Sequence, residues 1–377
     1  MSFPATSVFK LNTANKTIWI FGAGASADAP YNVPLQGNLL NHFFNMKAPG
    51  NQRFKIEFDR LKNEVVELCK LVQPGFPAED AILEEVFSAY EIKAKSAYST
   101  SDEVLHALNA IETLRRALRF STQVYGNGQA AKWNPHKRNN KSASYAELLE
   151  KLYPLGCSDD HLKKHILVTM NYDINIDRCV INMLSRDQGE LFVDYGIDFA
   201  DYRLSNSFTR PGDRSVLLLR LHGGLNWIRC KACNSMFTTI NKHANVVKTD
   251  KCKMCKCERL EQVLVHPSYT RSYSDPILQI IWGRFQEELV NSDRWVFIGY
   301  SLPTADVHLR ELLRHSLSVR KSRRKKTKII WVGKRSNNKD PKWLELAKSY
   351  FSVFEKNVKA WKATTGGFSY FVQEIRQ

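Results

Sequence analysis

Four short turns of this chain carry glycines or polar side chains, and each follows an apolar run. The first is Gly22, Ala23, Gly24, Ala25 and Ser26. Residues this small let backbone N–H groups approach a phosphate at the start of the following helix, where the helix dipole is positive. The turn is neither the full dinucleotide fingerprint nor a Walker-type loop. A plain tight turn is therefore the alternative interpretation.

The second turn places an amide beside a carboxylate. Asn171, Tyr172 and Asp173 follow the apolar run 166–170, and the carboxyl ends of parallel strands are where open α/β sheets bind ligands. The neutral Asn171 beside Asp173 can hold a sugar hydroxyl or a water without adding a second charge. Capping of the helix that starts at 174 is the alternative interpretation.

The third turn contains a histidine. His222 follows the run 216–221 and precedes Gly223 and Gly224. Imidazole titrates near neutrality, so His222 can serve as a general base, and the two glycines leave its ring accessible. A purely structural histidine is the alternative interpretation.

The fourth turn follows the run 295–298 and holds Gly299, Tyr300 and Ser301. Glycine permits a close approach of the backbone to a ligand. The hydroxyl of Ser301 can hydrogen-bond a ribose or a phosphate, so this turn is a second candidate for nucleotide contacts.

Four cysteines have the spacing of metal ligands. They form two CxxC pairs, Cys230 with Cys233 and Cys252 with Cys255. Four thiolates in two knuckles fit a closed tetrahedral Zn²⁺ site, which stabilises a small ribbon and leaves no open position for chemistry. Cys257 could replace Cys255 as the fourth ligand, although the two-residue spacing favours Cys255.

The elements that must position these turns alternate between strand and helix. This alternation predicts an α/β fold with a doubly wound and mostly parallel sheet. Strands are expected at 17–21, 166–170, 216–221, 262–265, 295–298 and 328–332, with a last edge strand at 364–372. Helices are expected at 36–46, 54–72, 81–94, 103–120, 175–184, 276–290 and 305–317, and a mobile loop at 126–141.

The domain organisation follows from this pattern. Residues 1–50 and 151–377 are expected to form the α/β core in two segments, and residues 51–150 an inserted helical module. The zinc ribbon, residues 228–262, lies within the core.

Charge and composition limit the class of protein. The 55 basic and 38 acidic residues leave a net charge of +17, which attracts phosphates or acidic partners. Seven of the nine residues in 320–328 are basic, which indicates either a nucleic-acid contact or a solvated turn between a helix and a strand. No apolar run is long enough to span a membrane. The absence of a signal peptide and the cysteine usage predict a cytoplasmic protein.

The order of these motifs resembles the sirtuin superfamily, and the match covers about residues 17–48 and 165–335. The resemblance implies a Rossmann-like domain and a small zinc ribbon with NAD⁺ between them. It also implies roles for individual residues: Gly22, Ala23, Gly24 and Ser26 at the pyrophosphate, Asn171 and Asp173 at the nicotinamide ribose, His222 as catalytic base, Asn171 as orienting residue, Gly299 and Ser301 at the adenosine half, Ala25 and Tyr300 within the same cofactor-binding turns, and Cys230, Cys233, Cys252 and Cys255 as zinc ligands.

The chain departs from sirtuin deacylases where those enzymes bind peptide. Deacylases follow the ribbon with a Phe-Gly-Glu segment that pairs with the acyl-lysine peptide, whereas this chain has 265–270, Val-His-Pro-Ser-Tyr-Thr. The stretch 29–36 also differs from the segment that closes over nicotinamide in deacylases. The resemblance is thus to the divergent bacterial sirtuin-like domains that hydrolyse NAD⁺ in anti-phage defence.

The expected function is therefore an NAD⁺ glycohydrolase that depletes NAD⁺ on infection. The alternatives are an NAD⁺-dependent protein deacylase and a non-enzymatic nucleotide-sensing or nucleic-acid-binding module. Unregulated hydrolysis would poison the cell, so we expect gating by homo-oligomerisation or by a partner such as a ring-forming ATPase, with the helices at 54–120 as the contact surface.

Overall fold

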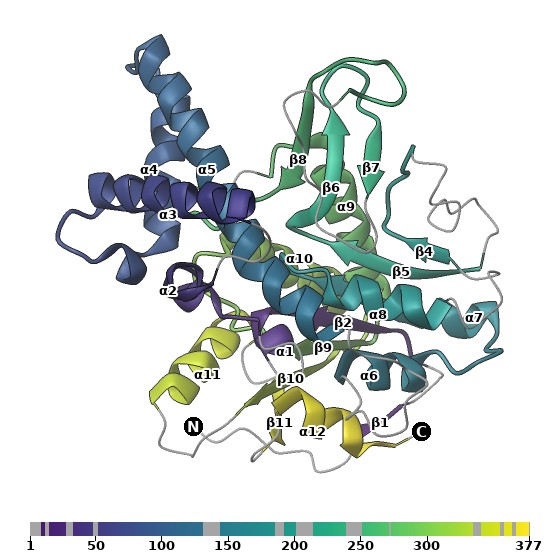
Figure 1. Cartoon of the computed structure of the whole chain (residues 1–377). Coiled ribbons are helices and arrows are strands. Elements are labelled where there is room, and N and C mark those ends of the chain that lie inside the picture. The colour runs from purple at the N-terminus through teal and green to yellow at the C-terminus, as the bar shows by residue number, and fades with distance from the viewer. Residues whose placement is uncertain are drawn as a thin grey trace.

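The computed structural model describes residues 9–11, 15–27, 33–47, 52–130, 144–184, 192–200, 214–238, 251–270, 273–334, 341–354, 358–363 and 367–376. Over these residues, seven strands form one central sheet (Figure 1). In spatial order they are β11 (Val358–Ala363), β10 (Lys328–Lys334), β9 (Arg294–Ile298), β2 (Thr17–Phe21), β3 (His165–Thr169), β5 (Ser215–Arg220) and β4 (Phe192–Asp194). Their pairings are parallel. The predicted doubly wound α/β fold is confirmed.

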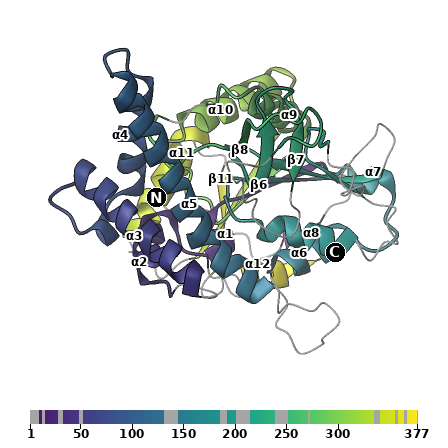
Figure 2. The ribbon, with the colours of Figure 1, turned by 45° about the horizontal axis from the view of Figure 1, so that its top comes forward.

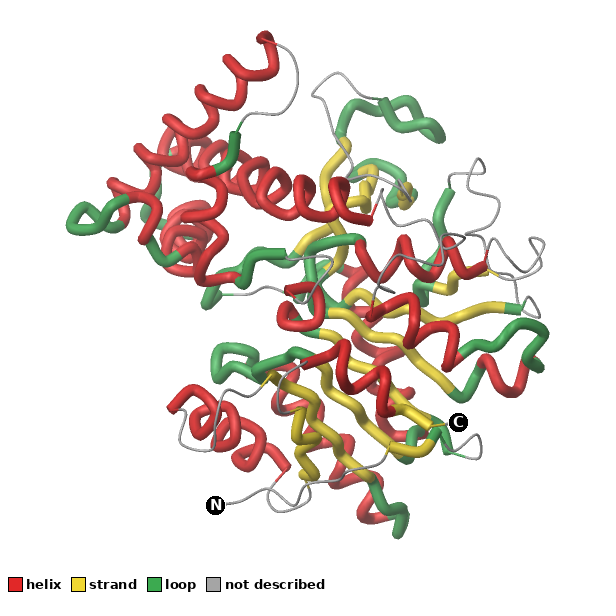
Figure 3. Tube along the Cα trace, turned by 60° about the horizontal axis from the view of Figure 1, so that its bottom comes forward, coloured by secondary structure: helices red, strands yellow, loops and turns green. Residues whose placement is uncertain are grey.

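The direction of winding reverses between β2 and β9. The chain moves outward from β2 on one side and later returns to place β9 on the other side. Right-handed crossovers in opposite directions put helices on opposite faces of a sheet, and Figure 3 shows both faces covered. One group of helices is α6 (Ser144–Leu152), α8 (Asn175–Leu184) and α12 (Gly367–Glu374), and the other is α9 (Pro276–Asn291), α10 (Val307–Ser322) and α11 (Pro341–Phe354).

The central strands are apolar because helices cover both of their faces. All residues of β2, β3 and β9 are buried, which is typical of a parallel sheet. Trp19, Trp295 and Trp331 fill the core with side chains that are at most 1% exposed. Two short strands, β1 (Phe9–Lys10) and β12 (Ile375–Arg376), pair with each other. Two short helices are α1 (Ala23–Ala27) and α7 (Asp159–Leu162).

The inserted helices share a second core, separate from the main one, with Leu225 and Leu264. They are α2 (Leu39–Asn45), preceded by the 3-10 turn Gln36–Asn38, and α3 (Gln52–Val72), α4 (Leu83–Lys95) and α5 (Ser101–Ala130), with a second 3-10 turn at Ala78–Asp80. Their buried faces meet around Phe43, Phe58 and Phe87. Tyr145 of α6 packs instead with the main core, so α2 shares the core of the helical module and α6 does not. Figures 1 and 2 show α4 and α5 projecting from the body of the molecule.

A small antiparallel sheet contains Cys230, and its connecting segments contain Cys233, Cys252 and Cys255. Its strand order is β7 (Met236–Thr238), β6 (Gly223–Cys230) and β8 (Leu260–Leu264). The strand expected at 262–265 is β8. It lies in this small sheet and not in the parallel one, because it pairs antiparallel with β6.

Two expectations for loops and edges were wrong. The segment 364–372 was expected to be an edge strand, but residues 367–374 form α12, in which Phe368, Phe371 and Val372 are buried at helical spacing. The mobile loop was expected from 126, whereas α5 continues to Ala130; residues 131–141 lie outside the described ranges. Among the described helices, none is both long and apolar enough to cross a membrane.

Candidate functional site

The four turns predicted from the sequence meet at one cavity. They follow β2, β3, β5 and β9 at the carboxyl edge of the sheet, where the winding reverses (Figure 1). The cavity has a volume of about 670 Å³. Eight of the predicted residues line it: Ala23, Gly24, Asn171, Asp173, His222, Gly299, Tyr300 and Ser301. Gly22, Ala25 and Ser26 are not among the lining residues, and Ala25 and Ser26 are buried.

Close packing of two turns explains their glycines. The N–H of Gly24 donates to the carbonyl of Gly299 over 2.8 Å, and a Cβ at Gly24 would lie 2.8 Å from that oxygen. Gly299 has a φ of +60°, and a Cβ there would lie 2.1 Å from the Ala25 nitrogen. Small residues are thus required by the contact between the turns themselves, in addition to any ligand.

The amide of Asn171 has a defined orientation. Its Nδ2 donates to the carbonyl of Gly22 and to Ser26 Oγ, both over 3.0 Å. A carbonyl oxygen only accepts hydrogen bonds, so the atom facing Gly22 must be the nitrogen. This orientation leaves Oδ1 as the acceptor of the Asn171 side chain, and the residue lines the cavity.

Tyr145 of α6 completes this support, and sequence reasoning missed it. Its hydroxyl lies 3.0 Å from Ser26 Oγ and 3.4 Å from Asn171 Nδ2. Burial raises the pKa of Tyr145 well above its ordinary value, so the hydroxyl keeps its proton. No local sequence signal marks Tyr145, because it lies 119 residues from Ser26.

Asp173 makes a contact typical of a helix cap and also lines the cavity. Its Oδ1 accepts the N–H of Asn175 over 3.0 Å at the start of α8, as expected of a helix cap, and the residue also lines the cavity. Burial raises the pKa of Asp173, while hydrogen bonds from Asn175 and Ser26 and the charge of Arg220 oppose that rise.

His222 has one defined tautomer. Its Nδ1 lies 3.0 Å from the carbonyl oxygen of Met170, which only accepts, so Nδ1 carries the proton and Nε2 keeps its lone pair. The rings of Tyr172 and Tyr273 stack on the imidazole with centroid distances of 5.9 and 6.3 Å. The ring is 5% exposed and lines the cavity, a position suited to proton transfer with a bound molecule.

The helical module closes the outer wall of the cavity. Glu84 of α4 and Thr122 of α5 line it, together with Tyr269 and the segment 33–37. Gln36 Nε2 donates to Glu84 Oε1 over 2.5 Å. The module, which the sequence predicts as an insertion and as a contact surface for partners, thus also lines the cavity.

A part-buried network, which we call the latch, joins this module to the segment after β8. Glu91 of α4 receives hydrogen bonds from His266 Nδ1 at 2.5 Å, Ser268 Oγ at 2.7 Å and Thr270 Oγ1 at 2.8 Å. Arg115 Nε of α5 donates to His266 Nε2 over 2.5 Å. Because Arg115 is always a donor, His266 must accept at Nε2 and is neutral in this arrangement.

The latch predicts that stability falls in acid. Burial lowers the pKa of His266 below its ordinary 6.5, against the opposing effect of Glu91. In the unfolded chain His266 has its ordinary pKa of 6.5. The stabilisation from neutral His266 is therefore complete above pH 6.5 and is lost as the pH falls below that value, toward the lower pKa of His266 in the folded protein. For Glu91, burial would raise the pKa, but its hydrogen bonds outweigh burial and lower it from 4.5 to about 2, so a second loss follows below pH 4.5.

Thermal unfolding between about pH 7.5 and about pH 5 measures the first of these losses. We expect the Tm of the wild type to decrease as the pH is lowered. We expect His266→Ala to have a lower Tm than the wild type at neutral pH and a Tm that depends less on pH. Parallel curves for the two proteins would show that His266 does not couple protonation to folding.

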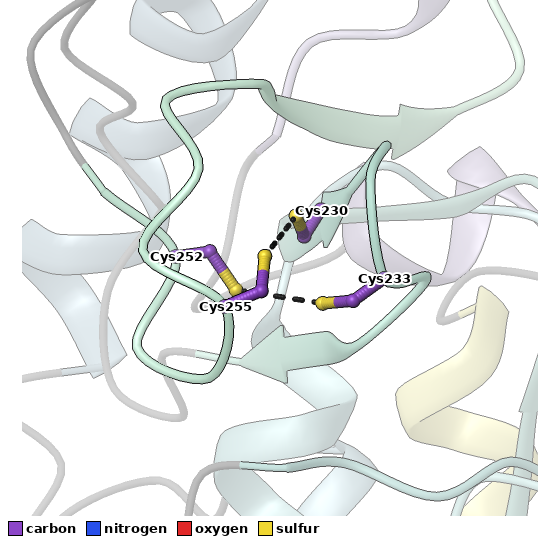
Figure 4. Close-up of side chains that lie close together, drawn as sticks. All are labelled: Cys230, Cys233, Cys252 and Cys255. Carbon is purple, nitrogen blue, oxygen red and sulfur yellow. Dashed lines mark hydrogen bonds between the residues drawn. The ribbon is translucent and has the colours of Figure 1, made fainter.

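The four predicted cysteines come together in the ribbon (Figure 4). Their Sγ atoms lie within 4.8 Å of one another, with Cys230 and Cys255 at 3.5 Å and Cys233 and Cys252 at 3.6 Å. Zn–S bonds of about 2.3 Å in a tetrahedron place the sulfurs about 3.8 Å apart. The donor set therefore fits structural Zn²⁺, and the cluster contains Cys255 rather than Cys257.

The basic run contains a structural arginine. Arg320 is fully buried and binds Thr327 Oγ1, the Val290 carbonyl and Asp293. The other basic residues of 321–326 are exposed. This arrangement agrees with the turn between a helix and a strand, since Arg320 ties the end of α10 to the segment before β10.

Comparisons with known proteins give only remote likeness. No protein-family model matches the chain, and no curated protein matches it. Solved structures that align with it include a Sir2 homologue in complex with NAD (13% identity, 96% of this chain and 88% of that chain, TM-score 0.43). Two others are a Sir2 homologue variant with ADP-ribose (14%, 96% and 92%, TM-score 0.38) and a Sir2–p53 peptide–NAD⁺ complex (13%, 95% and 90%, TM-score 0.38).

Proposed function

We propose that this chain hydrolyses the nicotinamide–ribose bond of NAD⁺ and releases nicotinamide and ADP-ribose. The observation that carries the proposal is the meeting of two oriented side chains at one cavity, Asn171, whose amide nitrogen donates to Gly22, and His222, whose Nδ1 is held by the Met170 carbonyl. They lie at the point of the sheet where doubly wound folds bind nucleotides. The motif order that resembles sirtuins, together with complexes of Sir2 homologues with NAD and ADP-ribose, supports NAD⁺ as the substrate.

The proposed reaction needs a general base and a hydrogen-bond acceptor, but it does not need a strong nucleophile. The C1′–N bond breaks, and its electron pair leaves with neutral nicotinamide while the ribose becomes oxocarbenium-like. Water then forms a bond to C1′, and its proton passes to His222 Nε2. Asn171 Oδ1 accepts a hydrogen bond from a ribose hydroxyl or from that water, and a positioned base contributes about 10²–10⁴-fold to such a step.

The ADP-ribose part of NAD⁺ is proposed to lie along the two turns that contain Gly24 and Gly299. Gly24 and Gly299 have no side chains, so the cavity wall there is made of backbone atoms. Ser301, which is exposed, also lines the cavity. Glu84, Thr122 and Tyr269 cover the other side and would limit the access of bulk water.

The latch favours hydrolysis over protein deacylation. The segment 265–270 corresponds to the stretch that sirtuin deacylases use to pair with an acyl-lysine peptide. Here its groups are engaged within the chain: Val265 N–H donates to the His222 carbonyl, Tyr269 N–H donates to Ser88 Oγ, and His266 binds Glu91. A peptide could pair at Tyr269 only after the helical module, which holds Ser88, had moved away, and at Val265 only after the bond to the His222 carbonyl had broken.

Gating by self-association or by a defence partner is part of the proposal. Four large apolar side chains are more than half exposed at the outer end of the hairpin formed by α4 and α5 (Figure 2), namely Ile92, Tyr98, Leu105 and Leu108. An exposed apolar cluster on a projecting element is typical of a protein contact. We propose that homo-oligomers, or a partner such as a ring-forming ATPase, bind there and control depletion of NAD⁺ during phage infection.

The test is a time course of the purified chain with NAD⁺ alone over a range of protein concentrations, with separation of nicotinamide, ADP-ribose and cyclic products. We expect equal amounts of nicotinamide and ADP-ribose without any acylated peptide, and a specific activity that rises with protein concentration. Turnover that requires an acyl-lysine peptide and yields acyl-ADP-ribose would identify a deacylase instead. NAD⁺ binding without turnover at any concentration would leave a nucleotide sensor.

A further inference from the structure

A fully buried arginine ends the strand that leads to His222. Arg220 is 0% exposed at the end of β5. Its Nη1 forms an ion pair with Asp177 of α8, which also accepts from Tyr195 Oη over 3.1 Å. The buried charge is thus balanced, and the ion pair leaves the other donors of the guanidinium for other partners.

Those donors bind the backbone of both catalytic turns. Nη2 donates to the carbonyl oxygens of Asn171, Tyr172 and Asp173 at 3.0, 3.3 and 2.9 Å. Nε donates to the carbonyl of Gly223 at 3.0 Å, directly after His222. One planar group therefore spans the Asn-Tyr-Asp turn and the His-Gly turn.

We propose that Arg220 is a positioning residue that sets the separation between Asn171 and His222. This inference rests on the proposed hydrolysis of NAD⁺. Arg220 does not line the cavity, so it acts through the two turns and not on the substrate. The planar fork of guanidinium is needed because its nitrogens reach separate acceptors at once, whereas lysine offers one nitrogen on a flexible stem.

The chain offers a matched control, Arg320, near the amino ends of the strands β9 and β10. Arg320 is also 0% exposed and donates to the carbonyls of Val290 and Lys326 and to Asp293. These partners lie beside the first residues of β9 and β10, away from the carboxyl ends that form the cavity. Both arginines therefore have similar burial and bonding, but only Arg220 contacts the catalytic turns.

The test compares Arg220→Lys with Arg320→Lys. Lysine keeps a positive charge beside Asp177, so Arg220→Lys avoids leaving a lone buried carboxylate. We expect both variants to lose thermal stability. Because misplacement of catalytic groups by about 1 Å can cost about 10²-fold in rate, we expect kcat of Arg220→Lys to fall by about that factor. Its affinity for ADP-ribose and the kcat of Arg320→Lys should change by less than about 3-fold.

Amide hydrogen exchange without substrate provides a readout that does not depend on turnover. We expect faster exchange in segments 169–175 and 221–226 of Arg220→Lys, and no change there in Arg320→Lys. Unchanged exchange, or a kcat close to that of the wild type in Arg220→Lys, would overturn the inference. A loss of kcat that merely follows Tm in both variants would also overturn it. If the wild type does not cleave NAD⁺, the proposed function fails, whereas exchange still decides whether Arg220 holds the turns.

Discussion

Replacement of His222 by alanine is expected to lower kcat for NAD⁺ hydrolysis by about 10²–10⁴-fold, the usual contribution of a positioned base. The Met170 carbonyl holds the proton on Nδ1 and leaves Nε2 to receive the proton of the attacking water. The imidazole lies at the cavity without supporting the glycine turns, so ADP-ribose affinity should change little. Release of nicotinamide measures kcat, and calorimetry with ADP-ribose measures binding.

A second buried histidine provides the control. His165 begins β3, at the opposite end of that strand from Asn171, and accepts from Trp19 Nε1 over 3.3 Å. Burial lowers the pKa of His165 to about 3, so it is a neutral structural residue at physiological pH. His165→Ala should lower Tm but leave the kcat of the folded protein near that of the wild type. If His222→Ala keeps its activity, the base lies elsewhere and the proposed mechanism is wrong.

Loss of the metal is expected to unfold the ribbon and to abolish activity. Structural zinc contributes about 10–16 kcal/mol in small zinc domains, which matches the total stability of about 5–15 kcal/mol typical of a folded domain. The ribbon is tied to the site because β6 runs from Gly223, next to His222, to the ligand Cys230. Removing the metal thus releases the strand that follows the proposed base.

The comparison of Cys230→Ser with Cys257→Ser tests this expectation. Cys230 belongs to the cluster of four thiols, and Cys257 does not. We expect one zinc per chain in the wild type and in Cys257→Ser, measured by release to a chromogenic chelator, and no stoichiometric zinc, a lower Tm and no activity in Cys230→Ser. Retention of zinc by Cys230→Ser, or its loss from Cys257→Ser, would contradict the ligand assignment.

The sequence was sufficient to locate the parts of the site but not their mutual support. Asn171, His222 and Gly299 each follow an apolar strand, and parallel strands bring their carboxyl ends to one edge of a sheet. That rule places the turns together without knowledge of side-chain contacts. The spacing of Cys230 and Cys233 likewise predicts a knuckle, because both ligands come from one local turn.

Packing decided where local patterns were ambiguous. The apolar residues of 367–374 fit either an edge strand or a helix, and the structure forms α12 because Phe368 contacts Phe21 and Tyr145 at centroid distances of 6.0 and 5.2 Å. Likewise, the strand expected at 262–265 pairs with β6, so a partner strand and not its own composition assigned it to the ribbon.

Residue types and spacing alone thus determined the α/β class, the amphipathic helices, the zinc ligands and the turns at the strand ends, because each depends on neighbours close in the chain or on a general rule of sheet topology. Tertiary structure alone decided the orientation of Asn171, the role of Arg220 and the latch at Glu91. Their partners lie 149, 49 and 175 residues away along the chain. Hydrogen bonds over such separations depend on how folded elements pack, which no local pattern of residues encodes.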